Sequence, residues 1–347
     1  MKQEKGNNLL VIRLSAMGDV AMTVPVLIAL TRKYPKLNLH VVSKPFFEPI
    51  FEGIPNLTFY AAKVKDEHKG IPGLYKLYKV LATAKINEVA DLHNVLRSKI
   101  IDQFFKLSGI KTVAIDKGRS EKKELTRDTD KKFRQLKTTH QRYADVFSRL
   151  GYPITLQENE FLKKRNLTYG AREMLGNSSH KWLGIAPFAA HEGKQYPLEL
   201  MQEVIDQVYK DNGCRILLFG GGKTETKLLE DIAAKNEQVL CVAGRFDFTE
   251  ELAIISQLDC MLSMDSGNGH LAAMFGIPVV TLWGVTHPFA GFAPYAQPEE
   301  NLLLADRKKF PLVPTSIYGN ALPRGYEGAI RTITPKTIVK RVLEILG

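Results

Sequence analysis

The chain alternates between short apolar runs and longer amphipathic segments. In the first half, five runs rich in β-branched and aliphatic side chains predict buried β-strands at 9–14, 38–43, 57–60, 88–93 and 111–116. Most of the segments between these runs repeat their apolar residues with a helical period. Strands joined by helical crossovers are typical of a parallel sheet, so the first half predicts a Rossmann-like α/β domain.

The second half repeats this alternation. Its helices include one over 198–210, which Pro197 begins, and an amphipathic helix over 335–346, which lies between Pro335 and Gly347. Apolar runs predict strands at 182–187, 214–220, 238–244, 259–264 and 277–284. This pattern predicts a second Rossmann-like domain.

The stretch 167–181 is rich in turn-forming residues, among them Gly170, Gly176 and the segment 177–179, and it predicts a linker. We therefore expect a first domain at 1–166 and a second domain at 182–347 that includes the final helix. Ligands bind at the carboxyl ends of strands in doubly wound sheets. Two such domains facing each other predict a central cleft, with functional residues placed directly after strands.

The length of 347 residues, with 44% hydrophobic and 24% charged residues, suits two globular domains and argues against a disordered chain. The longest apolar stretch, 9–30, contains Arg13 and Asp19, so no membrane-spanning helix is predicted. The N-terminal MKQEKGNN lacks the apolar core of a secretory signal, and we expect a cytoplasmic protein. Buried thiols are predicted for three cysteines that lie in apolar runs, Cys214, Cys241 and Cys260.

The formal net charge of +11 indicates an anionic partner, and the charge is concentrated. Residues 111–142 contain eleven Lys or Arg against five Asp or Glu. This segment is either a solvated face or a docking surface for a phosphorylated acceptor or for anionic lipid headgroups. It contains one aromatic residue, Phe133, and no nucleic-acid motif, so a nucleic-acid partner is not predicted.

The turn after the first predicted strand carries a candidate base. Ser15, Ala16 and Gly18 allow the backbone to turn tightly, and Asp19 begins the next helix. One interpretation is an acidic residue in a first helical turn, which the helix dipole favours. The other is a general base that faces the cleft.

The strongest motif, MDSGNGHLAAMFGIP, starts at the end of the strand predicted at 259–264. Its small and polar residues precede a helix expected from about 268 to 276. Bare backbone N–H groups and the helix dipole at that end would attract a phosphate. The alternative is a glycine-rich turn with a packed histidine. The candidate donor-binding residues are Asp265, Ser266, Gly267, Asn268, Gly269 and His270.

Two further loops carry candidates. Lys194 follows the strand predicted at 182–187 and could reach the same phosphates, the alternative being a solvated lysine. FGGGKTE at 219–225 resembles the end of a Walker A motif, but Leu217 stands where the first glycine is required, which argues against a nucleotide hydrolase. Glu225 beside a ribose hydroxyl remains a hypothesis. No GxGxxG follows the first strand and the histidines lack metal-ligand spacing, so neither a dinucleotide dehydrogenase nor a metal site is predicted.

Five segments together resemble the heptosyltransferases of glycosyltransferase family 9, which build the inner core of lipopolysaccharide. They are IRLSAMGDVAMTVPVLIAL at 12–30, DLHNVLRS at 91–98, KQYP at 194–197, DSGNGHLAAMFGIPVVTLWG at 265–284 and TPKTIVKRVLEIL at 334–346. The resemblance implies a GT-B fold of two Rossmann-like domains. It also implies an inverting, metal-independent transfer of heptose from ADP-heptose to an inner-core acceptor.

The resemblance also implies roles for individual residues. Asp19 matches the family's proposed base and Lys194 the lysine that contacts the donor phosphates, while Asp265 would contact the sugar. No cofactor is expected, and the acceptor is an anionic lipid-linked saccharide, with a peripheral contact to the inner membrane as one option. On the acceptor side we expect Ser15, Gly18, Arg97, Lys122 and Lys123.

The sequence departs from the family pattern at several positions. Phe188 and Tyr196 stand where the family usually has Gly and Trp, Met274 replaces the third Ala of its motif, and His93–Asn94 replaces a frequent Gln-Gly pair. These departures concern the sugar and the acceptor more than the reaction. Three alternatives stay open: another nucleotide sugar used in cell-surface polysaccharide synthesis, a sugar-nucleotide epimerase of the same fold, and a catalytically silent nucleotide-binding protein.

Overall fold

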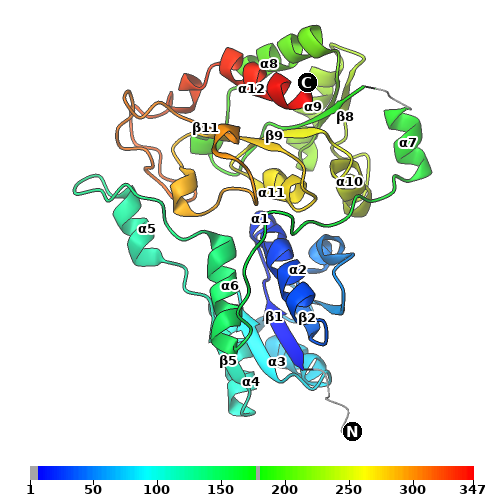
Figure 1. Cartoon of the computed structure of the whole chain (residues 1–347), viewed down its shortest axis with the longest axis vertical. Helices are drawn as coiled ribbons and strands as arrows, with labels where there is room; N and C mark the ends of the chain where they lie inside the picture. Colours follow the sequence, from blue (N-terminus) through cyan, green and yellow to red (C-terminus); the bar gives the residue numbers. More distant parts are fainter. Residues whose placement is uncertain (1–6, 177–179) are drawn as a thin grey trace. The chain divides into compact units, whose positions relative to one another are not determined.

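A computed structural model describes residues 7–176 and 180–347 (Figure 1). The chain forms two compact units. Unit 1 comprises the chain up to Lys117 together with Thr139–Leu162, and unit 2 comprises Gly118–Thr138 together with Lys163–Gly347. Residues 177–179 of the predicted linker, and residues 1–6, lie outside the described part of the chain.

Unit 1 is built on a five-stranded parallel sheet in the order β3-β2-β1-β4-β5. All five predicted strands are present; the central strands β1, β2 and β4 are largely buried, whereas the edge strands β3 and β5 are partly exposed. The strands are β1 (Asn8–Ile12), β2 (Asn38–Ser43), β3 (Leu57–Ala61), β4 (Glu88–Asp91) and β5 (Lys111–Ala114).

Helices cover both faces of this sheet. The chain moves one way across the sheet from β1 to β2 and the other way from β3 to β4 to β5, so right-handed crossovers place α2 opposite α3 and α4. α3 and α4 pack against each other and over Leu10, Ile12 and Val89. The helices of unit 1 are α1 (Met17–Ala21), α2 (Thr23–Lys33), α3 (Gly70–Ala82), α4 (Leu96–Leu107) and α6 (Thr139–Leu150), with a 3-10 turn η1 (Pro45–Phe51).

Unit 2 is a second parallel sheet, in the order β11-β10-β9-β6-β7-β8. The five strands predicted in the second half are present. The sixth, β11 (Leu302–Leu304), was not predicted, because it is a partly exposed run of three residues at the sheet edge, paired with β10. The other strands are β6 (Trp182–Ala186), β7 (Arg215–Leu218), β8 (Val239–Cys241), β9 (Cys260–Met264) and β10 (Val279–Trp283).

The core of unit 2 lies between its sheet and the paired helices α8 and α12. The predicted final helix is α12, with the bounds expected from Pro335 and the terminal glycine. The three cysteines are buried, as predicted. The helices of this unit are α5 (Arg119–Thr126), α7 (Tyr169–Leu175), α8 (Leu198–Asn212), α9 (Gly222–Ala233), α10 (Phe248–Ile255), α11 (Gly267–Ala273) and α12 (Pro335–Leu346), with 3-10 turns η2 (Glu192–Lys194), η3 (Pro288–Ala290), η4 (Glu299–Asn301) and η5 (Ile330–Thr332).

Residues 118–138, called the arm from here on, belong to unit 2, although the sequence placed them in the first domain. Leu125 and Leu136 of the arm form a small buried cluster with Ala290. The backbone N–H of Leu136 also donates to the carbonyl of Phe289 at 2.9 Å. The burial of these two leucines explains why the arm packs with the second half of the chain.

Lys131 also attaches the arm to the rest of unit 2. The ammonium of Lys131 donates to the carbonyls of Leu125, Leu312 and Pro314 at 3.1, 2.8 and 2.8 Å. The guanidinium carbon of Arg307 lies 3.4 Å from the ring centre of Phe133 in the arm. Part of the basic segment therefore serves to hold the fold together, which sequence patterning did not anticipate.

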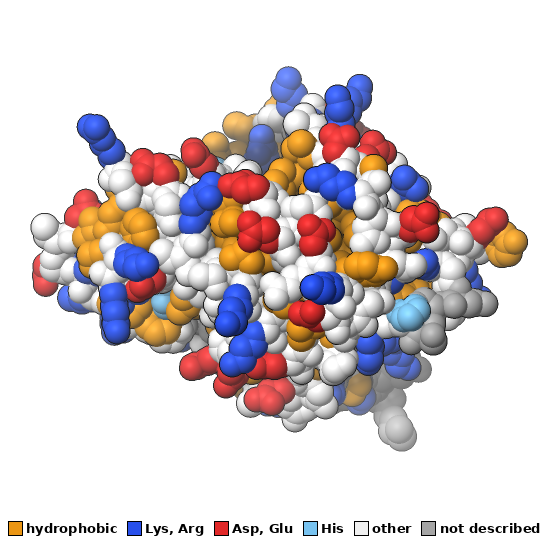
Figure 2. Space-filling model, turned by 90° about the horizontal axis from the view of Figure 1, so that it is seen from above, with side chains coloured by type: hydrophobic (Ala, Val, Ile, Leu, Met, Phe, Trp, Pro, Cys, Tyr) orange, Lys and Arg blue, Asp and Glu red, His pale blue; other side chains and the backbone are white. Residues whose placement is uncertain are grey.

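Within the described residues, no helix is long and apolar enough to cross a membrane. The net positive charge does not form one continuous field on every face. Figure 2 shows Lys and Arg side chains interspersed with Asp and Glu on the face that it draws. On this face the excess of positive charge is therefore not gathered in one basic patch.

Candidate functional site

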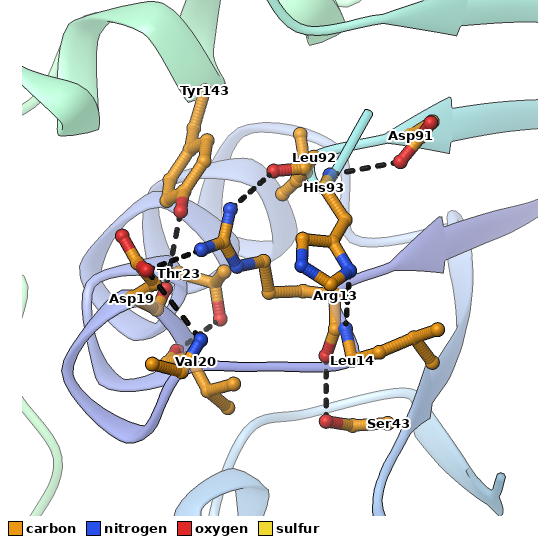
Figure 3. Close-up of polar contacts among 11 residues, drawn as sticks. Arg13, Leu14, Asp19, Val20, Thr23, Ser43, Asp91, Leu92, His93 and Tyr143 are labelled. Carbon is orange, nitrogen blue, oxygen red and sulfur yellow. Dashed lines mark hydrogen bonds and ion pairs between the residues drawn. The ribbon is translucent and has the colours of Figure 1, made fainter. Parts of the chain in front are cut away.

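Asp19 lies on α1, directly after the turn that follows β1 (Figure 3). Its Oδ2 atom forms an ion pair with the guanidinium of Arg13 and accepts a hydrogen bond from the backbone N–H of Ala16 at 3.4 Å. Its other oxygen, Oδ1, has no hydrogen-bond or ion-pair partner within the described chain. The carboxylate, 26% exposed, is thus held at one oxygen and available at the other.

Arg13, which orients Asp19, is itself nearly buried. It donates to the carbonyl of Leu92 at 2.8 Å, and its own carbonyl accepts from the hydroxyl of Ser43 at 2.6 Å (Figure 3). Its guanidinium carbon lies 5.9 Å from the ring centre of Tyr143. Sequence reasoning missed this residue, because it assigned Arg13 to the first strand. The sequence did contain a signal for Arg13, because a charged residue at the end of an apolar strand needs a hydrogen-bonding or oppositely charged partner.

Tyr143, which lies on α6, contacts both Arg13 and Asp19. Its hydroxyl donates to the backbone carbonyl of Asp19 at 3.2 Å. Burial raises the pKa of Tyr143, so the hydroxyl keeps its proton and remains a donor. Asp19 is therefore fixed through both its side chain and its backbone.

The loop after β4 lies against the turn that carries Asp19. Asp91 holds this loop, since its Oδ1 accepts from the N–H groups of His93 and Asn94 at 2.8 Å each and its Oδ2 accepts from the hydroxyl of Ser98 at 2.8 Å. The backbone N–H of Leu14 donates to the ring of His93 at 3.4 Å. Burial, followed by the charges of neighbouring basic residues, lowers the pKa of His93 to about 3, so the ring is neutral.

In unit 2, Lys194 and Asp265 form an ion pair that has little exposure to solvent. The ammonium of Lys194, at the end of η2, lies 2.8 Å from Oδ2 of Asp265 and donates to the carbonyl of Asp265 at 3.1 Å. The hydroxyl of Thr286, after β10, donates to the same Oδ2 at 2.9 Å. An ammonium has three N–H donors, and two are used here, which leaves one for a further acceptor.

The predicted phosphate-binding turn leads into α11 as expected, although the helix begins at Gly267 and ends at Ala273. Ser266 stands at its N-cap position without a capping hydrogen bond. A Cβ atom at Gly269 would lie 2.6 Å from the hydroxyl of Ser263, so glycine is required there for close packing on β9. His270 is buried within the same helix. Asp265, Ser266 and the first residues of α11 therefore lie in one place at the carboxyl edge of the sheet.

Glu225 lies in the first turn of α9 and accepts from the backbone N–H of Gly221 at 2.8 Å. It therefore stabilises its own helix N-terminus. Its expected role beside a ribose stays a prediction. Among the described residues, no group of three or more His, Cys, Asp or Glu could hold a metal ion.

The structure divides the predicted acceptor residues between the two units. Ser15 and Gly18 lie beside Asp19, and Arg97 lies exposed on α4, all in unit 1, whereas Lys122 and Lys123 lie on α5 of the arm in unit 2. Lys122 is 8% exposed and its ammonium lies 4.0 Å from the ring centre of Phe292. Lys122 and Lys131 of the basic segment are thus held within unit 2, and a docking role for the rest of the segment stays a prediction.

Comparison with known proteins assigns the chain to a family. The sequence model of glycosyltransferase family 9 (heptosyltransferase) matches residues 74–320. This chain belongs to glycosyltransferase family 9. The segment that contains Asp19 lies before the matched residues. As a family 9 member, the protein is a glycosyltransferase.

Individual relatives agree with this assignment. The family 9 chain is 24% identical over 310 residues to the lipopolysaccharide core heptosyltransferase of Haemophilus influenzae, a match that covers 84% of this chain and 83% of that protein. The family 9 glycosyltransferase structure from Veillonella parvula matches with a TM-score of 0.75 at 19% identity and covers 99% of this chain and 98% of that one. The Escherichia coli heptosyltransferase with ADP matches with a TM-score of 0.68 at 17% identity, over 97% and 99% of the two chains. These structures confirm the GT-B fold class.

Proposed function

We propose that this protein is an inverting heptosyltransferase that transfers heptose from ADP-heptose to an inner-core lipopolysaccharide acceptor. The family assignment and the name of the Haemophilus influenzae relative support the substrate class. The observation that carries the mechanism is the one-sided fixation of Asp19, which leaves Oδ1 without a partner in the described chain.

In the proposed reaction, Oδ1 of Asp19 takes the proton from the acceptor hydroxyl. The acceptor oxygen then forms a bond to the anomeric carbon from the side opposite the leaving group. The bond between that carbon and the phosphate oxygen breaks, and ADP leaves with the electron pair. A fixed carboxylate accelerates such a step through orientation and proton transfer.

The leaving diphosphate gains negative charge as the bond breaks. We assign its stabilisation to the free N–H of Lys194, the hydroxyl of Ser266 and the backbone N–H groups that begin α11. Fixed donors of this kind lower the barrier because they need no reorganisation during the reaction. Asp265, which accepts from Thr286, holds Lys194 in place, and we also assign to Asp265 a contact with the donor sugar. A metal ion is not needed in this scheme.

In this proposal the base belongs to unit 1 and the phosphate ligands belong to unit 2, so transfer needs residues of both units. Binding of the donor to unit 2 alone is expected to give no transfer. Exclusion of water from the reacting carbon would then depend on the acceptor and on unit 1.

The proposal is tested with the full chain, ADP-heptose and an inner-core saccharide acceptor. We expect ADP release that depends on the acceptor, and a product whose anomeric configuration, measured by NMR, is opposite to that of the donor. Consumption of the donor without an acceptor would favour the epimerase alternative. Transfer from a UDP- or GDP-hexose but not from ADP-heptose would show that the donor assignment is wrong.

A further inference from the structure

Helix α4 has two apolar sides. Ile101 and Phe105 on its inner side are buried in the core of unit 1. Apolar residues also recur every three or four positions on the outer side, where Leu96 and Leu107 are 75% and 85% exposed. The outer side carries the exposed Leu96 and Leu107 and, between them, Ile100 and Phe104, which are partly buried against the core of unit 1.

Helix α3 extends this outer stripe with aromatic rings. Tyr75 and Tyr78 contact Phe104, with ring centres 5.3 and 5.4 Å apart. Ile71 lies one turn before Tyr75 and is 62% exposed. We call these residues of α3, together with the outer residues of α4, the α3–α4 outer face. Several exposed apolar side chains on two packed helices are typical of an interaction surface.

The exposed charges of helices α3 and α4 themselves are positive, although the exposed Asp66 and Glu67 directly precede α3. Residues 69–87 contain four lysines and no acidic residue. On α4 the acidic residue is Asp102, which is 3% exposed and faces the core. Within the described chain, no carboxylate forms an ion pair with the exposed lysines of the two helices, Lys76, Lys79, Lys99 and Lys106.

We propose that the α3–α4 outer face docks on the surface of an anionic phospholipid bilayer. Aliphatic side chains and tyrosines enter the interface between headgroups and acyl chains, while lysines pair with lipid phosphates. A second copy of the chain would bring lysines against lysines, which is unfavourable. An aqueous polyanion would leave the leucines and tyrosines without an apolar environment. A bilayer satisfies both kinds of side chain.

The arm is less suited to this role. Lys131 and Lys122 are used within unit 2, and Lys132 and Arg127 form ion pairs with Glu124 and Asp130. The membrane option that the sequence attached to residues 111–142 therefore moves to another surface.

Co-sedimentation of the full chain with vesicles tests the proposal, in the absence of donor and acceptor. We expect binding to mixed phosphatidylglycerol–phosphatidylcholine vesicles and little binding to phosphatidylcholine alone. The triple variant Lys76→Glu, Lys79→Glu, Lys106→Glu should lower the partition coefficient by roughly 100-fold, since each basic residue contributes about five-fold at an anionic surface. Ile71→Ser with Leu107→Ser should lower it at least several-fold by removing apolar insertion.

Two control variants match these changes. Arg119→Glu, Lys123→Glu, Arg134→Glu changes the charge of the arm by the same amount, and Tyr169→Ser removes an exposed aromatic side chain from unit 2. Both should bind vesicles like the unmodified protein, and circular dichroism confirms that all variants fold. Equal binding of the α3–α4 variants and the unmodified protein, loss of binding in the arm variant, or self-association through this face without vesicle binding would each overturn the proposal. None of these results depends on which sugar the enzyme transfers.

Discussion

At the scale of single residues, the two oxygens of Asp19 differ. Arg13 and the N–H of Ala16 hold Oδ2, and this arrangement fixes the direction in which Oδ1 points. The sequence identified Asp19 as a candidate base. It did not identify Arg13 as the partner of this carboxylate, because that pairing depends on the tertiary structure. It also predicted Lys194 and Asp265 separately, without their ion pair.

Asp19→Ala is expected to lower kcat at least about 100-fold, the lower range for loss of a general base. ADP affinity, measured by calorimetry, should not change, because the proposed phosphate ligands lie in unit 2. Arg13→Lys keeps the charge but cannot reach both Leu92 and Asp19, so it should lower kcat with little change in the donor KM. Near-normal turnover of Asp19→Ala would remove this residue from the role of base.

Gly319 gives a test of the position of Lys194. A Cβ atom at Gly319 would lie 2.6 Å from Cγ of Lys194, and the residue has φ +82°. Gly319→Ala should displace the lysine and weaken ADP binding roughly 10-fold, the effect of one charge-assisted hydrogen bond. Gly325 has φ +85°, and a Cβ atom there would meet no other atom within 4 Å, so Gly325→Ala carries the same backbone strain without the clash. Equal ADP affinity in the two variants, or no loss in Lys194→Ala, would contradict this role of Lys194.

At the scale of elements, apolar runs predicted the buried central strands, which need continuous β-branched or aliphatic sequence, and also the edge strands β3 and β5. They did not predict β11, which is short and lies at an edge. They also placed the arm in the wrong unit. The pattern shows that Leu125 and Leu136 need burial, but it carries no information on which core buries them.

The β4–α4 connection depends on a pair of buried carboxyl groups. Burial, together with the charge of Asp91 and a hydrogen bond to it, raises the pKa of Asp102 from its ordinary 3.8 to about 8. The folded chain therefore keeps this proton between about pH 4 and 8, whereas the unfolded chain loses it. Asp102 contributes stability that is complete below pH 4 and is lost as the pH rises through this range.

Asp102→Asn should flatten that dependence, because the amide donates to Asp91 at every pH. Denaturant unfolding of the unmodified protein and the variant at pH 5 and 7 measures the difference in slope, which for one proton is at most about 1.4 kcal/mol per pH unit. Parallel pH profiles of the two proteins would show that Asp102 is not protonated in the folded state.

At the scale of the whole molecule, the family assignment gives the reaction class, and the proposed donor predicts that the chain prefers ADP over other nucleotides. A thermal-shift panel of ADP, UDP, GDP and NAD tests this preference. ADP at 100 times its Kd should stabilise the folded chain by about 2.7 kcal/mol and raise Tm, because a ligand that binds the folded state shifts unfolding by mass action. A response to NAD alone would contradict a glycosyl donor site.

The path of the chain also matters for dissection of this enzyme. The polypeptide passes from unit 1 into unit 2 at Lys117, returns at Thr139 and leaves again after Leu162. A fragment that stops at residue 162 would contain a loop whose leucines have lost their binding partner, and the remaining fragment would expose the complementary patch around Ala290. Chimaeras with related enzymes should therefore exchange residues 118–138 together with the C-terminal half, and not with the N-terminal sheet that surrounds them in sequence.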